Sequence, residues 1–320
     1  MGKLITGGTG YIGSELAHIL VARGEQVILF DLKENSFRID DIRKKVKVVL
    51  GDLADFSEVL NVVKDNKISE IYHLGSLLTY ISEVNPWASF HTNVLGTFNV
   101  LEAARIFEVE KVMFASTIGT FGLNVGEIFT DLTIQRPINM YGSGKLYGEC
   151  LGRYYRERFG LDFRSVRYTP VIGPGVRTPG HWAPVLIEDA ILGKPHICCG
   201  TPESTISLTY VKDAALAADM LLQAPKERIK MVNYNVAGVP EVVTAKEIES
   251  LLAKRLSRTD ITYTLDLTLQ VAKVHNILRV FDDSCAREEW NWQPVYNTPE
   301  KVIDIFEKDV KEHPSRYGLK

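Results

Sequence analysis

Short apolar runs and longer stretches of helical periodicity follow one another along the first half of the chain. The apolar runs at 3–6, 26–30, 46–50, 70–74 and 111–115 predict strands. Apolar positions three or four apart predict helices, which are expected after residue 10 and at 57–64, 90–107 and 145–159. Strands that alternate with helices are typical of a doubly wound parallel sheet, whose ligands bind beyond the carboxyl ends of the strands.

Proline and glycine become dense after Thr169, which predicts a loop-rich crossing into a second, smaller domain. Beyond this crossing we expect a strand and helix at 210–222, a strand at 261–265 and a last helix at 299–311. The helix at 244–256 begins with Thr244 and Glu247, the spacing of a capping box. We therefore predict a first domain at 1–168, with 207–235 returning to it, and a mainly substrate-binding domain at 169–320.

Three glycines at GxxGxxG spacing, Gly7, Gly10 and Gly13, occupy the turn between the first strand and the first helix, in the run Gly7-Gly8-Thr9-Gly10-Tyr11-Ile12-Gly13. Glycines let the backbone approach a ligand closely, and the free N–H groups of a helix N-terminus favour a pyrophosphate. Asp31 ends the next strand, where an acidic residue binds the adenosine ribose and repels a 2′-phosphate. These features favour NAD, although Lys33 and Arg38 leave NADP open and Asp31 could instead cap a loop.

Later strand ends add further candidates for cofactor contact. Asp52-Leu53 follows the third strand, where Asp52 could hydrogen-bond the adenine. The run Leu74-Gly75-Ser76 follows the fourth strand, and its small residues suit a close approach to a cofactor. His73 is interpreted as a packed strand-end histidine rather than an acid or base.

The candidate chemistry centres on Tyr141 and Lys145, which lie four residues apart and so share one face of a helix. An ammonium beside a phenol lowers the phenol pKa from roughly 10, which would make Tyr141 a base for an alcohol proton. Ser116 and Thr117 directly follow the fifth strand and could hold the substrate oxygen, or could simply cap a turn. By its spacing alone, the Tyr141–Lys145 pair could also be part of a solvated helix face.

Composition removes several classes of function. The net charge is −3 over 320 residues with both signs interspersed, which gives no reason to expect nucleic acid or an anionic membrane as a partner. The four cysteines have no ligand spacing and the seven histidines are scattered, so we expect no metal site, reduced thiols and a cytoplasmic protein.

Taken in order, these motifs resemble the extended short-chain dehydrogenase/reductase family, also called the NAD-dependent epimerase/dehydratase family. The resemblance covers essentially the whole chain and adds Asn93 to the set. It implies a Rossmann-type domain that binds NAD and a smaller C-terminal substrate domain. It also implies Tyr141 as the base, Lys145 as its electrostatic partner and ribose ligand, and Thr117, with Ser116 adjacent, as the catalytic hydroxyl. The nicotinamide is then expected near Tyr168, Pro170 and Val171.

Within this family, two branches compete for the substrate half. The segments 116–122, 131–137 and 282–290 resemble the L-threonine 3-dehydrogenase branch, although 179–184 and 275–278 depart from it where threonine would be recognised. The segments 167–175, 193–195 and 210–213 resemble nucleotide-sugar epimerases and dehydratases, but Ile206 stands where their diphosphate-binding arginine is expected. Arg177 or Arg279 could compensate for that arginine.

The resulting expectation is an NAD-dependent oxidation of a secondary alcohol in a small hydroxy compound. A nucleotide-sugar epimerase or dehydratase that keeps its NAD is the alternative. The expected substrate contacts are Ser76, Thr117, His181, Trp182 and Arg279, with His181 and Trp182 as either substrate-facing or merely packed. The resemblance further implies a homodimer formed by the helices at 90–107 and 145–159.

Overall fold

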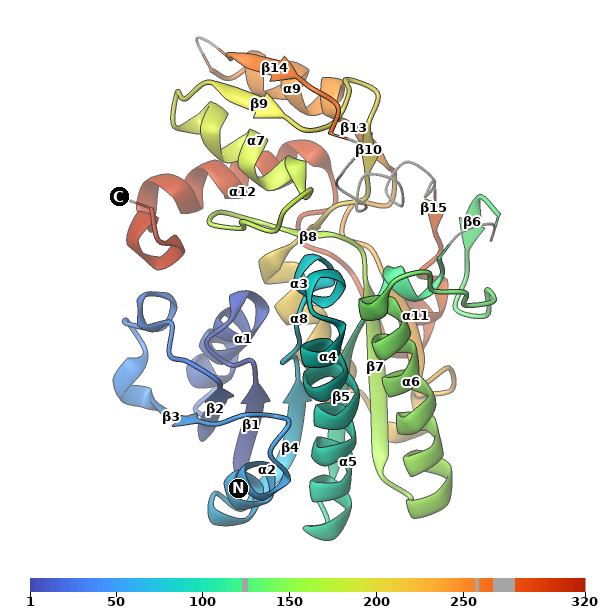
Figure 1. Cartoon of the computed structure of the whole chain (residues 1–320). Coiled ribbons are helices and arrows are strands. Elements are labelled where there is room, and N and C mark those ends of the chain that lie inside the picture. Colours follow the sequence, from blue (N-terminus) through green and yellow to red (C-terminus); the bar gives the residue numbers. More distant parts are fainter. Residues whose placement is uncertain (123–125, 257–258, 267–279, 320) are drawn as a thin grey trace.

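The fold is known from a computed structural model that describes residues 1–122, 126–256, 259–266 and 280–319. A seven-stranded parallel sheet forms its centre, with the order β12-β7-β5-β4-β1-β2-β3 (Figure 1). Its strands are β1 Gly2–Thr6, β2 Val27–Asp31, β3 Val46–Leu50, β4 Ile68–His73, β5 Lys111–Thr117, β7 Asp162–Tyr168 and β12 Asn233–Val236. The predicted doubly wound α/β fold is confirmed.

Helices cover both faces of this sheet, as apolar strands without a polar face require. Helix α1 (Tyr11–Ala22) and helix α8 (Val211–Gln223) pack against one face of the sheet and share a core cluster with it. Helix α2 (Phe56–Asp65) and helix α5 (Gly96–Ile106) pack into a second cluster on the opposite face. Helix α6 (Met140–Phe159) lies on that same face, where Gly148 and Gly152 approach the rings of Phe114 and Phe163.

The helix predicted at 90–107 is present, but its first six residues are π-helical. Helix α4 (Pro86–Ser89), preceded by α3 (Thr79–Val84), leads into a π-helical stretch at Phe90–Leu95 before α5 begins. Widened helical turns are frequent at functional sites. Here the π-helical stretch carries Asn93, whose side chain hydrogen-bonds both the N–H and the carbonyl of Leu77.

The smaller part of the protein lies beyond the carboxyl ends of the central strands (Figure 1). Its helices α7, α9 and α12 share one core cluster, and the predicted capping box of Thr244 and Glu247 is confirmed at the start of α9. The helices are α7 Trp182–Ile191, α9 Ala245–Ala253, α11 Ser284–Trp290 and α12 Pro299–Glu312. The paired strands are β6 Ile128–Phe129 with β15 Val280–Phe281, β8 Val171–Ile172 with β11 Thr209–Tyr210, β9 His196–Cys198 with β14 Ile261–Tyr263, and β10 Thr205–Ile206 with β13 Val243–Thr244.

The last described turn of the chain (Pro314–Tyr317) returns to helix α1. The single proton of the Tyr317 hydroxyl is shared between Glu15 on α1 at 3.1 Å and Asp309 on α12 at 3.0 Å, and Arg316 forms an ion pair with Glu15 at 2.9 Å. Buried polar contacts therefore connect the smaller part of the protein to the first helix. Across the described ranges, none of the helices has the length and apolar character that crossing a membrane requires.

Candidate functional site

The first helix begins at the glycine turn with its N-terminus open. Among the residues that the structure describes, no side chain caps α1 and no acidic residue lies in its first turn, so its free N–H groups remain available to an anion. Gly7 has a φ of +65°, and a Cβ there would lie 2.8 Å from the Cα of Gly75. Only glycine fits at that position, where two strand ends approach each other.

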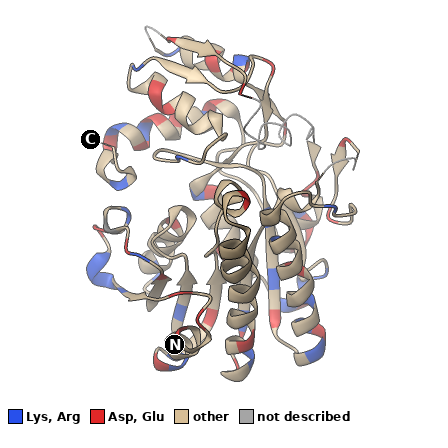
Figure 2. Ribbon diagram, viewed as in Figure 1, with Lys and Arg blue, Asp and Glu red and all other residues tan. Residues whose placement is uncertain are grey.

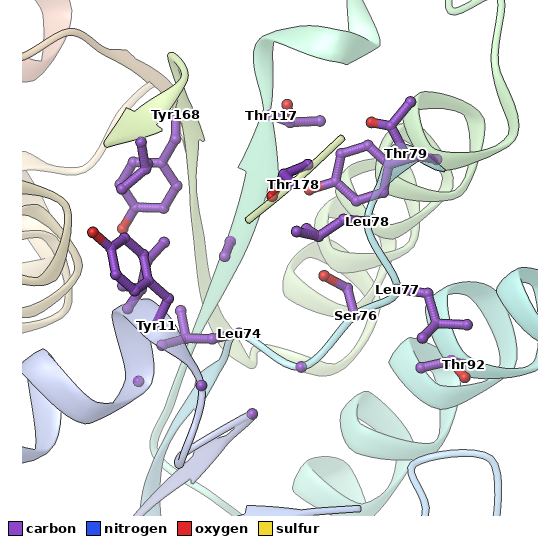
Figure 3. Close-up of a pocket in the computed structure, with 18 of the residues that line it drawn as sticks. Tyr11, Leu74, Ser76, Leu77, Leu78, Thr79, Thr92, Thr117, Tyr168 and Thr178 are labelled. Carbon is purple, nitrogen blue, oxygen red and sulfur yellow. The ribbon is translucent and has the colours of Figure 1, made fainter. Parts of the chain in front are cut away.

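A cavity of about 700 Å³ runs along the carboxyl edge of the sheet past this turn. That volume lies within the usual range for ligand sites, roughly 300–1,000 Å³. The predicted cofactor residues that line it are Gly7, Gly10, Tyr11, Ile12, Gly13, Asp31, Asp52, Leu53, Leu74, Gly75, Ser76, Tyr141, Lys145, Tyr168, Pro170 and Val171. In Figure 3, Tyr11, Leu74 and Tyr168 lie on one side of this cavity and Ser76, Leu78, Thr117 and Thr178 on the other.

The residues around this cavity fit a dinucleotide. The Tyr11 hydroxyl is buried with no hydrogen-bond partner in the part of the chain that the structure describes, which leaves it available to a ligand. At the far end, the Asp31 carboxylate accepts hydrogen bonds from the N–H of Thr9 at 3.0 Å and its hydroxyl at 2.9 Å. This places a fixed negative charge where an adenosine ribose is expected and a 2′-phosphate would be repelled.

Tyr141 lies in the first turn of α6, which Asn139 caps by accepting from the N–H of Gly142 at 2.7 Å. Burial raises the pKa of Tyr141 to about 12, although hydrogen bonds with Ser76 and Thr117 lower it in part. The predicted depression of this pKa by Lys145 is therefore wrong for the protein chain alone. Desolvation of the phenol outweighs the hydrogen bonds with Ser76 and Thr117.

Lys145 lies about one helical turn after Tyr141 on α6, and it is only 2% exposed. Its Nζ donates to the carbonyl of Ala115 at 2.8 Å and lies 5.7 Å from the centre of the Tyr141 ring. Burial lowers the pKa of Lys145 to about 7. Any further anion or hydroxyl beside this ammonium would therefore help to keep it charged.

The structure distinguishes the two hydroxyl candidates that the sequence left open. Ser116 donates to the buried carboxylate of Glu149 at 2.5 Å, so its proton is already used within the core. Thr117 accepts from the N–H of Gly119 at 3.1 Å and hydrogen-bonds Tyr141. Thr117 is the hydroxyl that faces the tyrosine, and Ser116 has a structural contact.

Two other predicted contacts do not line the cavity. Asn93 is 2% exposed and holds the backbone of Leu77 instead, so it supports the loop that carries Ser76. Trp182 is the first residue of α7 and is 6% exposed within the core of the smaller part. Trp182 is therefore not placed to contact a substrate in this cavity. His181 does line the cavity, and Arg279 lies outside the described residues.

His73 is a packed histidine, as its strand-end position suggested. It is 1% exposed between the hydroxyls of Thr6 at 2.7 Å and Thr97 at 3.1 Å. Burial, with a smaller contribution from the charge of Lys145, lowers the pKa of His73 to about 3. A neutral imidazole therefore connects the ends of β1 and β4 to α5.

Sequence reasoning missed several residues that line the same cavity: Leu77, Leu78, Thr79, Glu83, Thr92, Ile138 and Thr178. Leu77 to Thr79 continue the loop that begins with Leu74, so reading that loop further would have found them. Thr178 lies in the glycine- and proline-rich loop that the sequence singled out. Nothing in the local sequence distinguishes Glu83, Thr92 or Ile138.

Comparison with known proteins agrees with this geometry. Residues 3–237 match the model of the NAD dependent epimerase/dehydratase family. The bovine mitochondrial L-threonine 3-dehydrogenase is 30% identical over 95% of this chain and 81% of its own length. A solved GalE-like L-threonine dehydrogenase from Cupriavidus necator, in its holo form, is 27% identical with a TM-score of 0.88 and covers 97% of this chain and 100% of its own.

A monomeric L-threonine 3-dehydrogenase from a metagenome, solved in its apo form, is 26% identical with a TM-score of 0.87, over 97% of this chain and 99% of its own. The family predicted from the sequence motifs is confirmed by the match over residues 3–237. The chain belongs to the NAD-dependent epimerase/dehydratase family, and is an NAD-dependent enzyme of the extended short-chain dehydrogenase/reductase type.

Proposed function

We propose that this protein oxidises the secondary hydroxyl of a small hydroxy compound, with L-threonine as the first substrate to test. The observation that supports this most directly is the Tyr141 hydroxyl, buried in the NAD cavity between Ser76 and Thr117. A substrate hydroxyl in that position would have a proton acceptor and a hydrogen-bond donor together. Similarity to L-threonine 3-dehydrogenases over 95% of the chain supports the choice of compound.

In this proposal Tyr141 takes the hydroxyl proton and Thr117 holds the oxygen. NAD, when bound, would supply the acceptor for the hydride that leaves the carbon bearing this hydroxyl. Lys145 favours the phenolate form of Tyr141 and would bind the nicotinamide ribose. Because oxidised nicotinamide is also positively charged, the loaded site favours the phenolate more strongly than the chain alone does.

The substrate end is poorly suited to a nucleotide sugar, which would bring a second diphosphate. Ile206, at the position expected for the diphosphate-binding arginine, is 2% exposed in the core of the smaller part. Among the described residues that line the cavity, the loop between β8 and α7 supplies one arginine, Arg177. This arginine is already paired with Glu188. Glu188 offsets the charge of Arg177 and occupies one edge of its guanidinium, so Arg177 offers a diphosphate less than the unpaired arginine expected in place of Ile206.

The test is NADH formation, followed by its near-ultraviolet absorbance, when purified protein receives excess NAD and L-threonine. We expect steady NADH release with L-threonine and none with L-2-aminobutyrate, which lacks the C3 hydroxyl. A panel of small hydroxy acids covers the remaining substrates of this class. If none of these compounds gave NADH and the protein instead interconverted UDP-glucose and UDP-galactose, the epimerase would replace the dehydrogenase.

We also propose that two copies pair through the helices α4 to α6. Large apolar side chains are exposed along this face, and charged residues gather mainly at its lower end (Figure 2). The exposed side chains are Trp87, Phe90, Phe98, Ile106, Tyr147, Tyr154 and Phe159. Because one relative is monomeric, the test must be direct. Light scattering should give twice the mass of one chain, and a single-chain mass at high protein concentration would refute the pairing.

A further inference from the structure

An arginine on the loop between β8 and α7 enters the cavity from the smaller part of the protein. Arg177 lines the cavity, as do Thr178 and His181 of the same loop, and its side chain is 54% exposed. The proposed dehydrogenase chemistry assigns no role to this side chain. A half-exposed guanidinium inside a ligand cavity is available to a bound anion.

The orientation of Arg177 is fixed from behind by a buried carboxylate. Glu188 on α7 is 1% exposed and accepts from the guanidinium through both oxygens. The same carboxylate accepts from the N–H of Gly175 at 2.7 Å, and Nη1 of Arg177 also donates to the carbonyl of Val176 at 2.9 Å. The guanidinium is therefore preorganised before any ligand arrives.

These contacts leave part of the guanidinium unused. An arginine has five N–H donors. Both donors of Nη1 and one of Nη2 are engaged by Val176 and Glu188. Within the described ranges, Nε and the second donor of Nη2 have no hydrogen-bond partner, which is the pair of adjacent donors that matches two oxygens of a carboxylate or phosphate.

The loop that holds Arg177 also touches the cofactor turn. A Cβ on Gly173 would collide with the hydroxyl of Tyr11, the first residue of α1. Burial raises the pKa of Tyr11, and the charge of Glu188 adds to this effect. The loop continues to Thr178, which Figure 3 shows in the same cavity as Thr117 and Ser76. Arg177 thus lies on a loop that extends from the glycine turn before α1 toward Tyr141.

We propose that Arg177, positioned by Glu188, is an anion-binding fork that the smaller part of the protein contributes to the cavity. Its ligand is an oxyanion of fixed geometry, either the pyrophosphate of NAD or the carboxylate of the hydroxy substrate. The carboxylate source rests on the proposed function. The pyrophosphate source does not.

The experiment measures binding rather than turnover, by calorimetric titration of the purified protein. In the first arm the ligands are ADP and uncharged adenosine, which differ in the pyrophosphate. In the second arm L-2-aminobutyrate and its uncharged-carboxyl analogue, L-2-aminobutyramide, are added to NADH-saturated protein. We expect Arg177→Gln to weaken the anionic ligand of one arm by roughly 10- to 100-fold and its uncharged partner by less than about 3-fold.

Two further variants separate binding from folding. Arg177→Lys keeps the charge but loses the fork, so its affinity should fall between those of the wild type and Arg177→Gln. Arg43→Gln removes another glutamate-paired, partly exposed arginine that lies away from the cavity, and should change neither arm. Thermal unfolding of each variant shows whether the folded protein keeps its stability.

Each arm gives a decisive result. Selective loss of ADP binding assigns the fork to the cofactor, and selective loss of L-2-aminobutyrate binding assigns it to the substrate. Equal weakening of the charged and uncharged ligands, or no change in either arm, overturns the proposal. The ADP arm remains informative if L-threonine and its relatives prove not to be substrates, so failure of the proposed function would be recognised separately.

Discussion

Replacing Tyr141 by phenylalanine is expected to lower kcat by roughly 10²- to 10⁴-fold, the usual contribution of a positioned acid or base. The variant keeps the aromatic ring in the first turn of α6 and removes only the hydroxyl that hydrogen-bonds Ser76 and Thr117. NADH binding, measured by fluorescence titration, should stay within about 3-fold of the wild type, since the glycine turn and Asp31 are unchanged. Steady-state NADH formation measures the loss.

Tyr147→Phe provides the matched control on the same helix. Its ring is 41% exposed and does not line the cavity, so turnover should remain within about 2-fold of the wild type. If Tyr141→Phe retained wild-type turnover, the assigned base would be wrong whatever the substrate. If it lost NADH binding as strongly as turnover, Tyr141 would be a cofactor contact and not the base.

Replacing Glu149 by alanine is expected to lower the free energy of unfolding by about 3–5 kcal/mol, the cost of breaking a buried ion pair. The Glu149 side chain is fully buried and accepts from Arg167 at 2.7 Å, Asn233 at 2.9 Å and Gln135 at 3.1 Å, in addition to Ser116. The carboxylate therefore ties α6 to β5, β7 and β12. Its loss would leave the guanidinium of Arg167, itself only 3% exposed, without its charged partner. Urea denaturation measures the difference.

Acidity should modulate this loss in a defined direction. Burial alone would raise the pKa of Glu149, but the ion pair with Arg167 and the other hydrogen bonds outweigh it and lower this pKa. The stabilisation is thus complete above the unfolded-chain value of roughly 4.3 and is lost as the pH falls through the lower folded value. The difference in free energy of unfolding between wild type and Glu149→Ala should shrink as the pH falls through that range.

Ser116→Ala removes one neutral partner and should cost only about 1 kcal/mol with turnover retained. An equal cost for both variants would contradict the ion-pair account.

How much of this protein could be read from its sequence depended on the range of the contacts involved. The glycine turn, Asp31 and the Tyr141–Lys145 pair are local patterns tied to strand ends and helix periodicity, so spacing located them and the alternation predicted the sheet. Ser116 and Thr117 are neighbours of similar chemistry. Their different roles depend on Glu149, which lies 33 positions from Ser116 and reaches it only through packing.

The same reasoning explains the corrections. Asn93 was assigned to the cofactor because the family motif includes it, whereas the π-helical stretch turns its amide toward Leu77. The aromatic ring of Trp182 gave no indication of which side of the loop it would cover. The pKa of Tyr141 follows from burial that no spacing reveals, and the Arg177–Glu188 pair forms only when α7 folds against the loop.

The hydrogen bond between Tyr317 and Glu15 has a consequence for folding, because it joins residues 302 positions apart. Closing so long a segment costs conformational entropy, and contacts of large sequence separation form slowly. We therefore expect the strands and helices of the sheet to form before the junction that ties the last described turn to α1.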